Sequence, residues 1–99
     1  MISIEFEDDL KQIANILGYV EQSMQLIEEM AELTQSINKF RRYKTEDTKN
    51  NLIEEIADVS IVLYQLAYLL KIDKEEFNDI IDYKIQRTKK RIEKSGKNI

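Results

Sequence analysis

The chain has no cysteine, no histidine and no proline, and only two of its 99 residues are glycine. Without cysteine it can form neither a disulfide nor a thiolate metal site, and this composition suits a cytoplasmic protein. Without histidine it lacks the commonest general base and the commonest ligand of transition metals. Any active site in this sequence must therefore use carboxylates.

Long apolar runs are also missing. No run approaches the ~20 residues needed to span a bilayer, and no cationic segment precedes an apolar one at the N-terminus. We therefore expect a soluble chain without a membrane partner. The formal net charge of -4 argues against general binding to nucleic acid, because such binding needs Lys and Arg to replace released counterions.

The scarcity of glycine and proline favours helix almost throughout, so we predict an all-α fold. The length fits a single domain, residues 1–99. Asp73 and Glu76 are spaced as a capping box, and residues 95–99 are expected to form a frayed tail. Apolar periodicity and helix caps predict four helices: about 5–17, ended by Gly18; 19–42; 51–70, after the polar segment 44–50; and 73–94.

The predicted helix at 51–70 is apolar on every side from Ile56 to Leu70. Such a helix must be covered all round, and three other helices of so short a chain can hardly surround it. A second subunit would bury the remaining face. We therefore predict an obligate homo-oligomer, in which the four-helix chains form an intersubunit helical bundle. An overfilled four-helix monomer is the alternative.

Five acidic residues lie on two consecutive predicted helices. Glu28, Glu29 and Glu32 share an arc of ~100° on one helix, and Glu55 and Asp58 are neighbours on the next. Glu55 and Asp58 project from surface that is otherwise apolar, where an unpaired carboxylate costs several kcal/mol. A positive charge must compensate them. Hard oxygen ligands without His or Cys indicate Mg²⁺, with Mn²⁺ as a substitute.

These acids have two other possible interpretations. Glu28, Glu29 and Glu32 taken alone fit an ordinary solvated helix face, whereas Glu55 and Asp58 continue into a run of Val, Leu and Ile. A di-iron carboxylate bundle requires Glu-x-x-His pairs, and the chain has no histidine. The divalent cation site is therefore the preferred interpretation.

The two acidic motifs resemble the signature of the MazG-like all-α nucleoside triphosphate pyrophosphohydrolases, which is EExxE followed by ExxD. The resemblance runs from about Tyr19 to Leu70 and more loosely to Arg91. The matching elements are Glu28-Glu29-Met30-Ala31-Glu32 and Glu55-Ile56-Ala57-Asp58, with family-like flanks at Gln25-Leu26-Ile27, Leu33 and Asn51-Leu52-Ile53.

The resemblance implies an enzyme that hydrolyses a nucleoside triphosphate to the monophosphate and pyrophosphate with bound Mg²⁺. It also implies a dimer or a dimer-of-dimers tetramer with helices mixed between subunits. Carried over by position, Glu29, Glu32, Glu55 and Asp58 would hold the metal. Glu28 would be a further ligand or the base that orients the attacking water, and Glu28 or Glu29 would take the proton. The sequence leaves open which acid has which role.

The resemblance further implies that basic residues of the last helix bind the substrate phosphates. Lys84, Arg87 and Arg91 lie on one side of that helix and fit this role, although a surface column that complements the helix end is an alternative. Family members often have Asn just before this Lys, whereas this chain has Asp82 and Tyr83 there. The nucleotide contact at that place is therefore open.

The sequence is also compatible with three other functions. A phosphoribosyl-ATP pyrophosphohydrolase belongs to the same reaction class, but its Tyr-His pair after the second motif is absent. A noncatalytic helical oligomerisation or regulatory module would keep the acids for solubility and bind divalent ions only at nonspecific strength. A nucleic-acid-binding role rests only on the basic end of the predicted helix 19–42, at Lys39, Arg41, Arg42 and Lys44.

Overall fold

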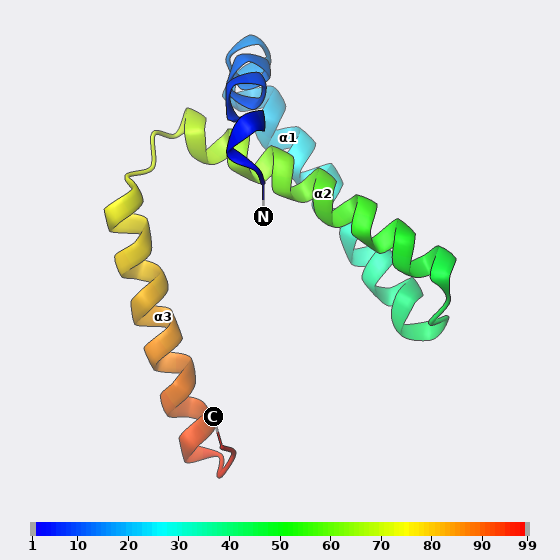
Figure 1. Cartoon of the computed structure of the whole chain (residues 1–99), viewed down its shortest axis with the longest axis vertical. Helices are drawn as coiled ribbons and strands as arrows, with labels where there is room; N and C mark the ends of the chain where they lie inside the picture. The colour runs from blue at the N-terminus through cyan, green and yellow to red at the C-terminus, as the bar shows by residue number, and fades with distance from the viewer. Residues whose placement is uncertain (1, 99) are drawn as a thin grey trace.

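The computed structural model describes residues 2–98, and its regular structure is entirely helical over that range. A short 3₁₀ turn, η1 (Ile4–Phe6), precedes three α-helices: α1 (Glu7–Arg42), α2 (Glu46–Leu69) and α3 (Lys74–Lys94). Figure 1 shows α2 running back beside the second half of α1, so that the two form an antiparallel hairpin. The all-α prediction is confirmed.

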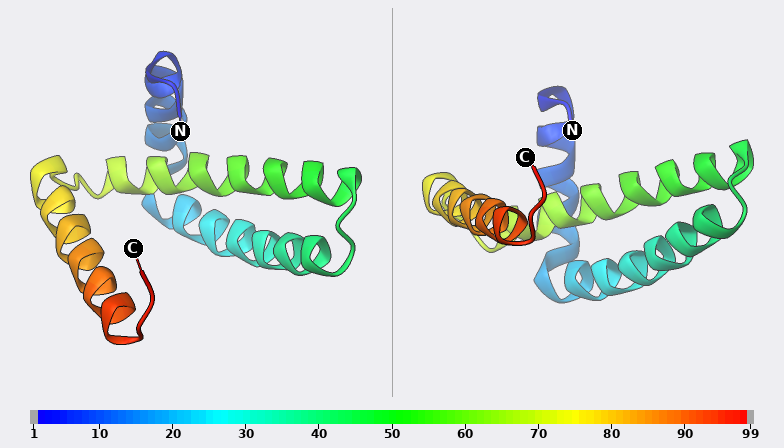
Figure 2. Two further views of the ribbon diagram at one scale, coloured as in Figure 1. Left: turned by 60° about the horizontal axis from the view of Figure 1, so that its bottom comes forward. Right: turned by 90° about the horizontal axis from the view of Figure 1, so that it is seen from below.

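The predicted number of helices is wrong, because residues 2–98 contain three α-helices rather than four. The segments predicted at 5–17 and 19–42 belong to one element, α1. Gly18 has φ 82° and ψ 171°, a conformation almost restricted to glycine, and Figure 2 shows α1 bending sharply there. No loop separates the two parts, since the backbone is helical on both sides of this residue. We call residues 7–17 the N-terminal arm and residues 19–42 the C-terminal arm of α1.

α2 begins at Glu46, well before the predicted start at residue 51. The Thr48 amide donates to the Thr45 hydroxyl at 3.2 Å, and the Thr45 amide donates to the Thr48 hydroxyl at 3.2 Å. This reciprocal capping box starts the helix inside the polar segment 44–50, ahead of the predicted helix. At the start of α3, the Asp73 carboxylate accepts from the Glu76 amide at 2.9 Å, which is one of the two bonds of the predicted box.

The end of α3 is closed by Gly96, whose φ of 82° places it in the left-handed region. The Lys97 amide then donates to the Ile92 carbonyl at 3.2 Å, as in a Schellman cap. The segment predicted to fray thus begins with an ordered cap. Ile99, the last residue of that segment, lies outside the described residues.

The core is small and lies where α2 meets the two arms of α1. Gln65 Nε2 donates to the Leu10 carbonyl at 3.0 Å and ties α2 to the N-terminal arm. Asn51 Nδ2 donates to Ser36 Oγ at 2.8 Å and ties α2 to the C-terminal arm. The buried residues are Leu10, Ala14, Leu26 and Val62, together with the polar Gln22, Ser36 and Gln65.

α3 does not pack against the rest of the chain. None of its residues is buried, and among residues 2–98 it makes no helix–helix contact with α1 or α2. Figures 1 and 2 show it extending away from the hairpin. Large apolar side chains such as Phe77 on α3 and Leu63 on α2 are therefore about half exposed. Within residues 2–98, no helix combines the length and apolar character of a membrane-spanning segment.

Candidate metal centre

Three acidic side chains from two helices meet on the hairpin. One carboxylate oxygen each from Glu29, Glu32 and Glu55 lies within 4.8 Å of the other two. Glu29 and Glu55 are partly buried, and Glu32 is exposed. The antiparallel hairpin creates this group, because it brings the middle of the C-terminal arm beside the first half of α2.

The other two predicted site acids lie outside this group. Asp58 is exposed, and its carboxylate oxygens are not among those that lie within 4.8 Å of one another. Its negative charge nevertheless raises the pKa of both Glu29 and Glu55. Glu28 is exposed and outside the group as well. The structure thus brings together Glu29, Glu32 and Glu55, leaves Asp58 beside them, and places Glu28 toward solvent.

The charge of the group is uncompensated. Partial desolvation raises the pKa of the Glu29 carboxyl, and the nearby negative charges of Asp58 and Glu32 raise it further. Desolvation also raises the pKa of Glu55, with Glu32, Asp58 and Glu29 adding to the shift. In the described part of the chain, no cationic side chain is among the groups that act on either carboxyl.

Two carboxylate oxygens in the group lack any hydrogen bond. Glu29 Oε2 and Glu55 Oε2 are buried and have no partner among residues 2–98. A buried acceptor without a partner is costly, and more so when it is charged. A divalent cation would satisfy both oxygens and neutralise the mutual repulsion of the acids. The donor set consists of oxygen alone, which fits Mg²⁺ or Mn²⁺.

Gln25 is a further member of this site. It lies one helical turn before Glu29, and its Nε2 donates to Glu29 Oε1 at 2.6 Å. In the motif comparison Gln25 is only a flanking residue. The i, i+4 spacing of a Gln and a Glu on one helix is the sequence signal that predicts this bond.

The predicted phosphate-binding residues lie elsewhere. Lys84, Arg87 and Arg91 are exposed on α3, whose backbone does not lie against the hairpin within residues 2–98. The guanidinium of Arg87 lies 5.8 Å from the ring centroid of Tyr83, on its own helix. Within one chain, the structure therefore does not bring these cations to the acids.

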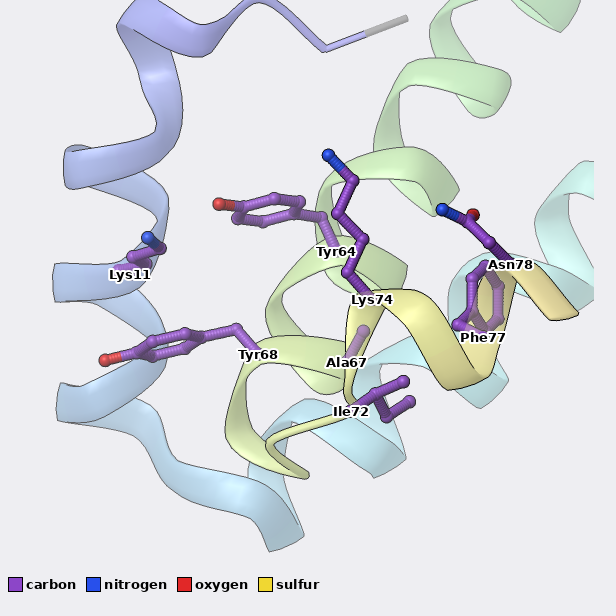
Figure 3. A pocket seen from close by; sticks show the side chains of 8 residues that line it. All are labelled: Lys11, Tyr64, Ala67, Tyr68, Ile72, Lys74, Phe77 and Asn78. Atoms are coloured by element: carbon purple, nitrogen blue, oxygen red, sulfur yellow. The ribbon is translucent and has the colours of Figure 1, made fainter.

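A separate concavity of about 590 Å³ lies between the N-terminal arm, the end of α2 and the start of α3, as Figure 3 shows. The Lys11 ammonium lies 5.6 Å from the ring centroid of Tyr68, whose hydroxyl accepts from Asn15 Nδ2 at 3.0 Å. Its lining contains two ammonium groups and no carboxylate, so this concavity is not a cation site. The lining residues are Lys11, Tyr64, Ala67, Tyr68, Ile72, Lys74, Phe77 and Asn78.

No protein-family model matches the chain, and comparison with curated proteins and with solved structures returned no match. The resemblance to MazG-like enzymes therefore stays a prediction from the two motifs. The case for a metal centre rests on the geometry of the acids themselves.

The metal-free protein should gain stability from Glu29 and Glu55 as the pH falls from neutral toward 4.5, the ordinary value for such a carboxyl. Folding raises the pKa of both groups, so the folded chain binds their protons more tightly than the unfolded chain does. This contribution is complete below the ordinary pKa and is lost as the pH rises through the raised values. Melting temperatures measured across this range in the presence of a chelator test it.

The matched variants for this measurement are Glu55→Gln and Glu54→Gln. Glu55→Gln should flatten the dependence on pH, because it removes one of the two carboxyls whose pKa is raised. Glu54 is exposed on α2 next to Glu55, and its replacement should leave the slope as in the unmodified chain. Equal slopes in both variants would contradict the prediction.

Proposed function

We propose that this protein is a Mg²⁺-dependent hydrolase that converts a nucleoside triphosphate to the monophosphate and pyrophosphate. The observation that carries the proposal is the meeting of Glu29, Glu32 and Glu55 with two unsatisfied, buried carboxylate oxygens. The motif resemblance supplies the reaction class. Mn²⁺ is the proposed substitute for Mg²⁺, because both ions accept the same oxygen ligands.

The proposed roles follow from exposure and position. A bound divalent cation supplies charge neutralisation at the phosphate oxygens and a lowered pKa for the attacking water. Glu29, Glu32 and Glu55 would hold the cation, and Asp58 would add a fourth negative charge close to it. Glu28, which is exposed and adjoins Glu29 in the sequence, would take the proton of the water, with Glu29 as the alternative base.

We also propose that the enzyme works as a homo-oligomer, a dimer or a dimer-of-dimers tetramer. The isolated chain exposes 8267 Å². A compact monomer of 11.8 kDa exposes about 5,900 Å². Two chains that each buried the excess of roughly 2,400 Å² would form an interface of the size found in permanent homodimers.

Oligomerisation also offers a source of positive charge for the substrate phosphates. α3 does not reach the acids of its own chain, so Lys84, Arg87 and Arg91 can approach an acidic group most simply in a second copy. On α3 these three residues flank the apolar positions Phe77 and Ile81. If that apolar side packs on a partner hairpin, the basic column lies at the border of the interface.

The test is a panel of canonical and modified nucleoside triphosphates, incubated with Mg²⁺, in which monophosphate, pyrophosphate and orthophosphate are scored separately. We expect monophosphate and pyrophosphate in equal amounts, without orthophosphate, and no reaction with a chelator. Including phosphoribosyl-ATP tests the related reaction. If no nucleotide reacts and Mg²⁺ binds only at nonspecific strength, the noncatalytic oligomerisation module replaces this proposal, since the exposed apolar side of α3 supports it independently.

A further inference from the structure

The two oxygens of the Glu29 carboxylate differ in their hydrogen bonding. Oε1 accepts a 2.6 Å hydrogen bond from Gln25 Nε2, whereas Oε2 is buried and has no partner among residues 2–98. The bond therefore fixes which oxygen of Glu29 is left for a cation. It also favours the ionised carboxylate, which is the form that binds metal.

We infer that Gln25 is a positioning residue of the metal centre, whose amide holds Glu29 so that Oε2 binds the divalent cation. This inference rests on the proposed function. Loss of a hydrogen bond that orients a metal-binding side chain typically lowers metal affinity by about 10- to 100-fold. Gln25 itself does not bind the cation.

The amide of Gln25 is suited to this task because it is a neutral donor. The other groups that act on the Glu29 carboxyl are the acids Asp58 and Glu32. A lysine or arginine in the place of Gln25 would pair with Glu29 and compete with the cation for its charge. The amide orients the carboxylate and leaves its charge available.

The contribution of Gln25 to the fold itself is small. Its side chain is exposed on α1, and one exposed i, i+4 pair adds little to the stability of a helix. A substitution at this position therefore separates metal affinity from folding. Gln25→Met keeps the length of the side chain and removes the hydrogen-bond donor.

The experiment measures Mg²⁺ and Mn²⁺ affinity by calorimetric titration of the full chain, together with the melting temperature of the metal-free protein. We expect Gln25→Met to weaken binding of both ions by about 10- to 100-fold without lowering that melting temperature. The matched control is Gln12→Met, an exposed glutamine on the N-terminal arm, which should bind both ions as the unmodified chain does.

The outcomes separate this inference from the proposed function. If the unmodified chain binds the ions and Gln25→Met binds them equally well, the positioning role is wrong and the metal centre stands. If Gln25→Met lowers both the affinity for the ions and the melting temperature of the metal-free protein, the role of Gln25 is structural and the inference is also wrong. If the unmodified chain binds neither ion, the proposed function and the inference both fail.

Discussion

Replacing Glu32 by alanine should reduce Mg²⁺-dependent release of pyrophosphate by about a thousandfold or more, and Asp58→Ala should do the same. The bound cation supplies several kcal/mol of charge stabilisation in the transition state, and each 1.36 kcal/mol is a factor of ten in rate, so losing about 4 kcal/mol gives this loss. Glu32 is one of the three converging acids, and the charge of Asp58 acts on the other two. The measurement is initial rates of pyrophosphate release at saturating nucleotide and Mg²⁺.

Stability measurements distinguish the loss of a metal ligand from loss of the fold. The metal-free Glu32→Ala variant should melt no lower than the unmodified chain, because the change removes a negative charge that acts on Glu29 and Glu55. The added stability on binding Mg²⁺ should disappear. Glu54→Ala, on the exposed side of α2, serves as the activity control. Full activity in both Glu32→Ala and Asp58→Ala would refute the site.

The features of the fold that were predictable from sequence are short-range ones. Helix follows from the absence of proline, and the start of α3 follows from Asp73 and Glu76, which interact over one turn. The break at Gly18 was predicted as a helix end, yet a glycine with positive φ serves equally in a cap and in a bend. Which of the two occurs depends on tertiary packing, since Leu10 and Ala14 of the N-terminal arm are buried.

The acidic group was predictable for a similar reason. The spacing of Glu29 and Glu32, and that of Glu55 and Asp58, is a local property of each helix. The register of α2 against α1 depends on contacts between residues that are far apart in the sequence. This register places Glu55 within the group and leaves Asp58 outside it. The place of α3 could not be predicted from the chain alone, because its apolar side has no partner within the chain.

The double substitution Ile81→Glu and Ile85→Glu should dissociate the homo-oligomer. Both side chains lie on the apolar side of α3, where they are 41% and 48% exposed in the isolated chain. Fully burying an isoleucine contributes about 1.5–3 kcal/mol, and about half of each side chain is still exposed in the isolated chain. Losing two isoleucines in each of two chains therefore costs about 3–6 kcal/mol and weakens association by about a hundred- to ten-thousandfold, before the cost of burying charge. Sedimentation equilibrium at micromolar chain concentration measures the change in mass.

The control for this variant is Gln86→Glu, which adds one negative charge on the opposite side of α3, where Asp79 and Lys90 also lie. It should leave the assembly intact. Lys84, Arg87 and Arg91 lie on the same helix as the two isoleucines. The double variant should therefore lose pyrophosphate release when its mass falls to that of the monomer, even though every acidic ligand is retained. A folded, active monomer of the unmodified chain would contradict the proposed assembly, and an unchanged oligomer in the double variant would contradict the role of this side of α3.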